Sequence, residues 1–188
     1  MYFGAIGYRS ILIDMLKTLI FFYLAFMVFT GSAQQLENQK LVLSINEYVE
    51  MLENKSDWDS IVEFQLLNYS SRGAHLSSFF EKDEIQKLSL KASGATTTLE
   101  KYYYLKDGEL MYFSEKSYDL PYNEGTENKV LTRMLDYETK CYFNEERLFQ
   151  QLELDELNSN NTEIYLKEMG NSILEDLELL KIAIIEKY

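Results

Sequence analysis

The chain has 188 residues, of which 31 are acidic and 18 basic, giving a net charge of −13, and it contains one Cys and one His. A single Cys excludes an intramolecular disulfide, and one Cys with one His excludes a zinc site made of those two residue types alone. The acidic balance excludes nucleic-acid binding that depends on net positive charge. Because 46% of the residues are hydrophobic, we expect a folded domain and not a disordered chain.

The N-terminal region carries an uninterrupted apolar run, LIFFYLAFMVF, at residues 19–29. Lys17 precedes the run and the small residues 31–33 follow it, which is the pattern of a secretory signal peptide. A helix that spans a bilayer needs about 20 apolar residues, so the run is short for a membrane anchor. We therefore expect signal peptidase to cut between Ala33 and Gln34.

This cleavage would divide the chain into a signal peptide, residues 1–33, and a single mature domain, residues 34–188. We expect the product to be periplasmic or secreted, with no stable membrane anchor after cleavage. Met15 by itself would start a complete signal peptide, so residues 1–14 are a candidate mis-assigned start. The alternative is an uncleaved helix that extends the run backward through Ile11-Leu12-Ile13.

Hydrophobic periodicity predicts the first elements of the mature chain. Apolar residues at spacings of three and four predict an amphipathic helix over residues 36–53. From Ile61 to Leu66 the period is two, which predicts a half-buried strand. Turn residues then separate three more predicted strands, which lie at residues 74–81, 85–92 and 96–106.

Asp107-Gly108 lies between two aromatic-rich runs and predicts a two-residue hairpin, because Asp and Gly tolerate the positive φ that such turns need. Residues 142–148 look like a degenerate copy of the sequence around this turn. The copy has Glu146 in place of the Gly, so we expect its tip to be built differently. Between the two hairpins, residues 117–129 contain the only Pro and predict a loop.

The C-terminal segment predicts a second helix. Asn160 and Glu163 have the spacing of an N-cap and the third helical residue. An apolar stripe then continues to Ile184, which predicts an amphipathic helix of about 25 residues, weakened at Gly170-Asn171. The tail LLKIAII, residues 179–185, is apolar on more than one side, and a strand there is the alternative.

A helix, a run of antiparallel strands and a second helix indicate an α+β fold. We expect an N-terminal helix, an antiparallel sheet of about six to eight strands built from hairpins, and a C-terminal amphipathic helix packed on one sheet face. We also expect both helices to cover the same face, which would leave the other face wet or available to a partner.

No sequence pattern predicts a catalytic, cofactor or metal site, and we expect no cofactor. The chain lacks H-E-x-x-H, G-x-S-x-G and glycine-rich phosphate loops. Adjacent carboxylates such as Glu145-Glu146 fall in predicted turns, where acidic residues are expected as solvated surface. Cys141 and His75 lie on different predicted strands, so we expect Cys141 to be a small buried hydrophobe and not a nucleophile.

Aromatic residues are unusually dense between residues 102 and 122. Alternate residues of a strand face opposite sides, so they cannot all lie in one core. Cross-strand pairing of aromatic rings accounts for part of this density. An exposed aromatic surface for a partner is the other interpretation, since Tyr offers contact area at low entropic cost. The candidate partner-binding residues are Tyr102, Tyr104, Tyr112, Tyr118 and Tyr122.

The Y-Y-x-x-D-G-x-L hairpin at Tyr103–Leu110 and its looser repeat at Cys141–Leu148 occur together with a signal peptide and a closing acidic helix. In this combination the chain resembles small exported bacterial proteins of uncharacterised function. The resemblance implies export and a helix–sheet–helix architecture for most of residues 36–188. It implies no catalytic residue.

The sequence is compatible with three functions. The first is a non-catalytic binding or interaction module that contacts an envelope or extracellular protein, or a glycan, through its aromatic-rich sheet face. The second is a carboxylate-dependent hydrolase acting on glycan or peptide, which requires two acidic side chains to converge in a cleft. The third is an acidic inhibitor or immunity-type protein. The charge argues against nucleic acid and anionic lipid surfaces as partners.

Overall fold

The computed structural model describes residues 18–19, 35–119, 134–153 and 162–187. The chain divides into two compact units, Met1–Ser44 and Ile45–Tyr188. The sheet and the sites below belong to the second unit. The predicted cleavage residues Ala33 and Gln34 lie outside the described residues. Within the part described, neither helix has the length and apolar character needed to cross a membrane.

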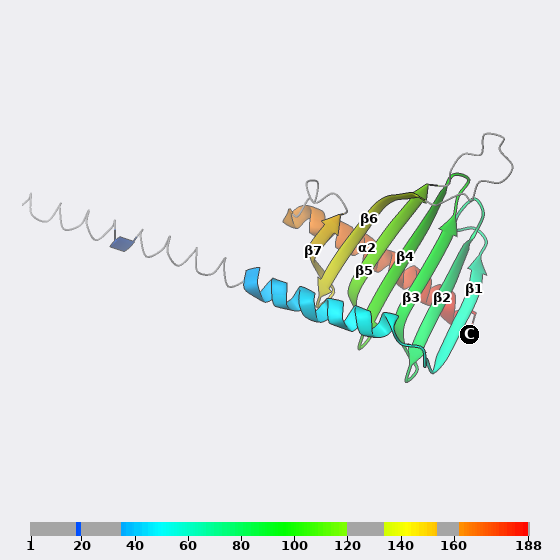
Figure 1. The fold of residues 1–188 in the computed structure, drawn as a ribbon, viewed down its shortest axis with the longest axis horizontal. Helices are drawn as coiled ribbons and strands as arrows, with labels where there is room; N and C mark the ends of the chain where they lie inside the picture. Colours follow the sequence, from blue (N-terminus) through cyan, green and yellow to red (C-terminus); the bar gives the residue numbers. More distant parts are fainter. Residues whose placement is uncertain (1–17, 20–34, 120–133, 154–161, 188) are drawn as a thin grey trace, which may run out of the picture. The chain divides into compact units, whose positions relative to one another are not determined.

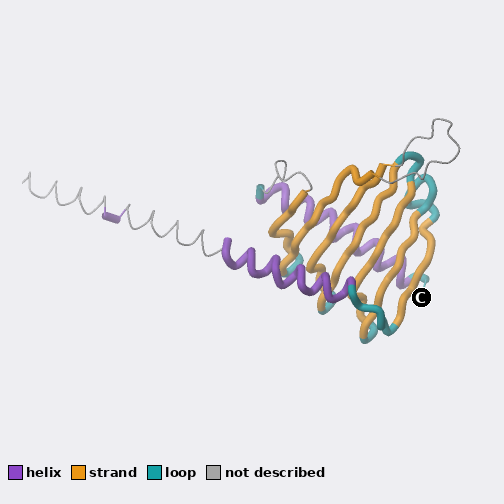
Figure 2. Tube along the Cα trace, in the orientation of Figure 1, coloured by secondary structure: helices purple, strands orange, loops and turns teal. Residues whose placement is uncertain are grey.

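The described residues of the second unit form a seven-stranded antiparallel sheet, and the α+β prediction is confirmed (Figures 1 and 2). Each strand pairs with the next one in the chain, and two-residue turns at residues 82–83, 107–108 and 145–146 connect three of these pairs. The strands are β1 (Ser60–Leu66), β2 (Ala74–Glu81), β3 (Glu84–Ser93), β4 (Thr97–Lys106), β5 (Glu109–Asp119), β6 (Met134–Asn144) and β7 (Arg147–Glu153).

Two helices accompany the sheet in the described residues. Residues 35–53 are helical (α1), close to the predicted range. The C-terminal helix α2, Glu163–Ile185, starts after Thr162, and Asn160 lies outside the described residues. The LLKIAII tail continues this helix, as its unbroken apolar stripe indicated. Ser117 to Asp119, expected in a loop, belong to β5, because they keep the strand's pairing with β4.

The three tightest hairpins share one turn geometry. Both central residues have positive φ in the turns at Lys82-Asp83, Asp107-Gly108 and Glu145-Glu146. The expectation that the Gly-less tip would be built differently is therefore wrong. Glu146 adopts a φ of 58° although only Gly reaches this region without steric cost. The flanking strand pairs impose the twist that this turn satisfies.

Residues 45–53 of α1 and helix α2 pack on opposite faces of the sheet, which corrects the expectation that both helices would share one face. The buried residues of α2 belong to one core cluster with Leu88 and Leu90 of β3. Glu53 of α1 instead binds Lys87 of the same strand, whose side chain points the other way. Figure 1 shows the end of α1 and α2 on different sides of the strands. Both sheet faces carry aromatic and aliphatic side chains, so each offers a helix apolar surface to bury.

Candidate functional site

The candidate tyrosines that the structure describes share one side of the sheet but differ in how far they are buried. Tyr102, Tyr104, Tyr112 and Tyr118 lie on the α1 side of β4 and β5, and Tyr122 is outside the described residues. Tyr104 and Tyr112 are 4% and 7% exposed, whereas Tyr102 and Tyr118 are half-buried. Only the latter pair therefore offers ring surface to a partner. We call the part of this face that carries them the open face.

An aromatic row lies beneath residues 45–53 of α1 and accounts for the buried tyrosines. The cross-strand register aligns Lys87, Tyr104, Tyr112 and Tyr142 across β3 to β6. The rings of Tyr104 and Tyr112, and those of Tyr112 and Tyr142, pack edge to face with centroids 5.5 and 5.2 Å apart. Such pairs add to the burial of apolar area. This row forms the contact surface for the end of α1.

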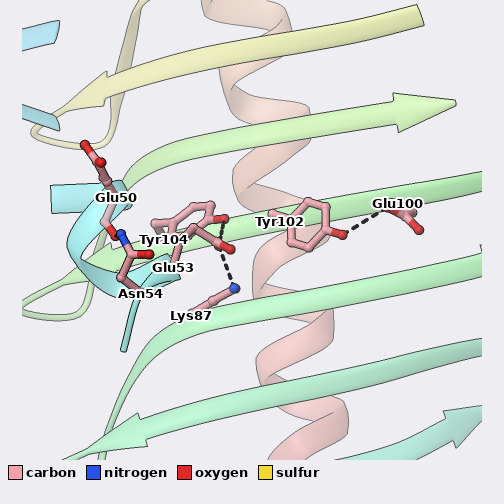
Figure 3. A network of polar contacts seen from close by, with 7 residues as sticks. All are labelled: Glu50, Glu53, Asn54, Lys87, Glu100, Tyr102 and Tyr104. Atoms are coloured by element: carbon pink, nitrogen blue, oxygen red, sulfur yellow. Dashed lines mark hydrogen bonds and ion pairs between the residues drawn. The ribbon is translucent and has the colours of Figure 1, made fainter. Parts of the chain in front are cut away.

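Glu53 fixes the end of α1 to this row (Figure 3). Its Oε1 accepts a hydrogen bond from the Tyr104 hydroxyl and lies 2.6 Å from Lys87 Nζ. The ammonium of Lys87 also lies 5.2–5.8 Å from the ring centroids of Phe79, Tyr102 and Tyr104. Burial opposes ionisation of Glu53, but the hydrogen bonds from Lys87 and Tyr104 outweigh it and lower its pKa. The rings of Phe79, Tyr102 and Tyr104 therefore surround a cation of the chain itself, the ammonium of Lys87.

Beyond the aromatic row, a row of alternating charges crosses the open face. The register places Lys91, Glu100, Lys116 and Glu138 opposite one another on β3 to β6. Lys91 approaches Glu100 at 3.8 Å, and Lys116 approaches Glu138 at 3.3 Å. The side chains of Lys91 and Lys116 are 54% and 34% exposed. The carboxylates of Glu100 and Glu138 are mostly buried, so the exposed lysines are the part of this row that is accessible to a partner.

Tyr102 and Tyr118 stand on either side of this charge row. The Tyr102 hydroxyl donates a hydrogen bond of 3.0 Å to Glu100 Oε2, and Glu100 is itself buried. Burial and then this hydrogen bond raise the pKa of Tyr102, so its hydroxyl remains a donor at neutral pH. The resulting surface holds two tyrosine rings and alternating charges in fixed positions.

The opposite, α2 side of the sheet contains a hollow of about 520 Å³ between α2 and strands β4 to β6. Lys101 Nζ lies there, 2.7 Å from Asp176 Oδ2 and 3.6 Å from Glu115 Oε2. The Tyr103 hydroxyl donates to the same Asp176 oxygen at 2.6 Å, and the Tyr137 hydroxyl donates to Glu115. The structure therefore brings together two carboxylates that are far apart in the sequence.

The sequence patterns did not single out this cluster. Lys101 and Glu115 are ordinary charged residues within alternating strands, and Asp176 is one of many acids on α2. The hairpin at Asp107-Gly108 indicates that the two strands pair, but a register shift between Tyr104 and Leu105 is what places residues 101 and 115 opposite each other. No sequence pattern indicated which turn of α2 would lie above them.

The described residues contain no group of three His, Cys, Asp or Glu side chains arranged to hold a metal ion. Cys141 is fully buried on β6, as expected for a small hydrophobe, and burial raises its pKa to about 12. No protein-family model, curated protein or solved structure matches this chain.

Proposed function

We propose that the chain is an exported, non-catalytic binding protein whose open face contacts an envelope or extracellular protein. One observation carries the proposal: Tyr102 and Tyr118, both half-buried, flank a partly exposed row of alternating charges. Tyrosine gives contact area at low entropic cost, and fixed alternating charges select a partner of matching pattern. The apolar run at residues 19–29 supports export.

Site-specific photo-crosslinking in the expressing cell tests this function. A photoreactive phenylalanine analogue replaces Tyr118 in a C-terminally tagged chain, and a matched control places it at Glu178, which is exposed on α2. We expect the probe at residue 118 to capture one protein that the probe at residue 178 does not. Tyr102→Ala in the same chain should abolish this capture. Equal capture from both positions, or capture from residue 178 alone, would contradict the proposal.

The same purified material separates the alternatives. Mass spectrometry of its N-terminus shows whether the mature chain begins at Gln34. A glycan partner would give no protein adduct, and its binding would respond little to ionic strength. Binding by an acidic inhibitor would weaken steeply with salt and would tolerate Tyr102→Ala, because it depends on the net charge of −13.

Hydrolysis is a second candidate function, favoured by the convergence of Glu115 and Asp176 on Lys101 in one hollow. Both carboxylates lie against Lys101, and each accepts a tyrosine hydroxyl hydrogen bond, Asp176 from Tyr103 and Glu115 from Tyr137, so the pair would supply the acid and the base of such a reaction. Glu115→Gln and Asp176→Asn should each abolish any turnover of glycan or peptide substrates. Activity that survives both substitutions would rule this function out.

A further inference from the structure

The hollow between α2 and β4 to β6 has the size of a small-molecule site. Its volume of about 520 Å³ lies within the range of about 300–1,000 Å³ common for ligand pockets. It opens beside α2, on the side of the sheet opposite the open face, so it is independent of the surface on which the proposed function rests.

The charges in this hollow do not balance. Three carboxylates line it, those of Glu115, Glu175 and Asp176, and Lys101 is the one cation among the lining residues. Burial disfavours the Lys101 ammonium, but the hydrogen bond and the charge of Asp176 raise its pKa, so it stays protonated. Lys101 is already engaged by Asp176 and Glu115, which leaves net negative charge for a ligand to neutralise.

The remainder of the lining is largely apolar. Phe113 and Ile173 are buried at the sheet–helix contact, while Leu179 is 66% exposed on α2 at the edge of the hollow. Exposed apolar surface beside partly buried carboxylates suits a molecule that carries both a cation and a hydrocarbon body.

From this charge excess and apolar lining we propose that the hollow binds a small organic cation, with an amine or guanidinium group near Glu115 and Glu175 and an apolar body against Leu179. An anion placed near Lys101 would also lie near the carboxylates of Glu115 and Asp176, which would repel it. A neutral molecule would leave the excess negative charge uncompensated.

A second hollow, of about 610 Å³, lies near the end of α2 and provides the control. Its three acidic residues, Asp83, Glu84 and Asp107, are exposed at or beside hairpin turns, where water and salt screen their charge. The side chains of Glu115 and Asp176 are only 23% and 24% exposed, so their field in the first hollow is screened less.

Three isosteric probes test the proposal by calorimetry and NMR on the protein recovered from expressing cells. Phenylbutylamine should bind with a dissociation constant on the order of 1 mM and shift resonances of residues around Leu179. Phenylbutanol should bind at least about threefold more weakly, and phenylbutyrate more weakly still. Equal binding of the alcohol, tighter binding of the acid, or no binding of the amine would overturn the proposal.

Substitutions locate the site. Glu175→Gln should weaken amine binding by about threefold without affecting the fold, because Glu175 is exposed. Glu115→Gln should weaken it further, with a circular-dichroism spectrum showing whether that variant remains folded. Glu84→Gln, in the second hollow, should leave binding unchanged. A loss with Glu84→Gln and none with Glu175→Gln would place the amine in the wrong hollow and refute the assignment.

Discussion

Tyr103 and Tyr104 are neighbours in the chain, yet their hydroxyls donate hydrogen bonds to carboxylates of different helices on opposite faces of the sheet. Tyr103 donates to Asp176 of α2, and Tyr104 donates to Glu53 of α1. Burial, followed by the hydrogen bond to the carboxylate, raises the pKa of each tyrosine. One dipeptide of β4 thus connects the sheet to both helices.

Removing either hydroxyl should destabilise the protein. We expect Tyr103→Phe and Tyr104→Phe each to lower the free energy of unfolding by about 1.5–3 kcal/mol, because each hydroxyl bonds a charged group in a buried setting. Urea denaturation measures the change. Tyr165→Phe on α2 is the control and should alter stability by less than about 0.5 kcal/mol. Tyr103→Phe and Tyr104→Phe that unfold like the unmodified chain would show that these bonds contribute nothing.

The turn at Glu145-Glu146 offers a stabilising substitution. Glu146 has a φ of 58°, so Glu146→Gly should raise the free energy of unfolding by about 0.5–1 kcal/mol, the relief of backbone strain exceeding the added entropy of the unfolded chain. Gly108 has a φ of 82° in the equivalent turn, and Gly108→Ala should lower stability by about 1 kcal/mol. Thermal denaturation of both variants checks the pair, and a shift of the same sign in both would contradict the turn geometry.

Replacing Gly170 of α2 by alanine should lower the free energy of unfolding, whereas the same replacement of an exposed helical glycine raises it. Alanine ordinarily stabilises a helix interior by about 1 kcal/mol relative to glycine. A Cβ on Gly170 would lie 2.9 Å from the Leu148 Cβ of β7, so we expect Gly170→Ala to destabilise by about 1–3 kcal/mol. Asn171→Ala, at the adjacent exposed position, should stabilise slightly. Stabilisation by Gly170→Ala would show that α2 can move away from β7.

Ser78 carries a buried hydroxyl without a hydrogen-bond partner in the part of the chain described. Its side chain is 0% exposed on the α2 side of β2. Ser78→Ala should therefore raise the free energy of unfolding by up to about 1 kcal/mol, since an unsatisfied buried hydroxyl costs free energy. The adjacent Ser77→Ala removes a 3.0 Å hydrogen bond to Glu63 and should not stabilise. Urea midpoints that fall for Ser78→Ala would reveal a bond to an ordered water.

Stability should decline at alkaline pH. Burial is the largest cause that raises the pKa of Tyr48, to about 12, and it also raises the pKa of Tyr112. A tyrosine in the unfolded chain has a pKa of about 10. Above about pH 10 the unfolded chain therefore binds fewer protons than the folded chain, and stability falls as pH rises. Cys141 acts in the same direction. The urea midpoint at about pH 11 should lie below that at about pH 9; an unchanged midpoint would contradict this.

The sequence by itself determined the order and type of the elements. The alternation in β1 to β5, the Asp107-Gly108 turn and the apolar stripe of α2 are local patterns, and local backbone preference and periodicity suffice to specify them. The α+β class follows from their order. The prediction for the Glu145-Glu146 turn was wrong, because the pairing of β6 and β7 imposes a strained backbone there that the two residues themselves do not favour.

The tertiary structure alone decided which sheet face each helix covers. Both faces carry buried aromatic rings, so alternation could not tell whether residues 45–53 would lie beside α2 or opposite it. That choice buries Tyr104 and Tyr112 and leaves Tyr102 and Tyr118 on the open face. It also sets Asp176 above Lys101 and Glu115. These contacts join residues distant in the chain, and such contacts depend on packing that no local pattern records.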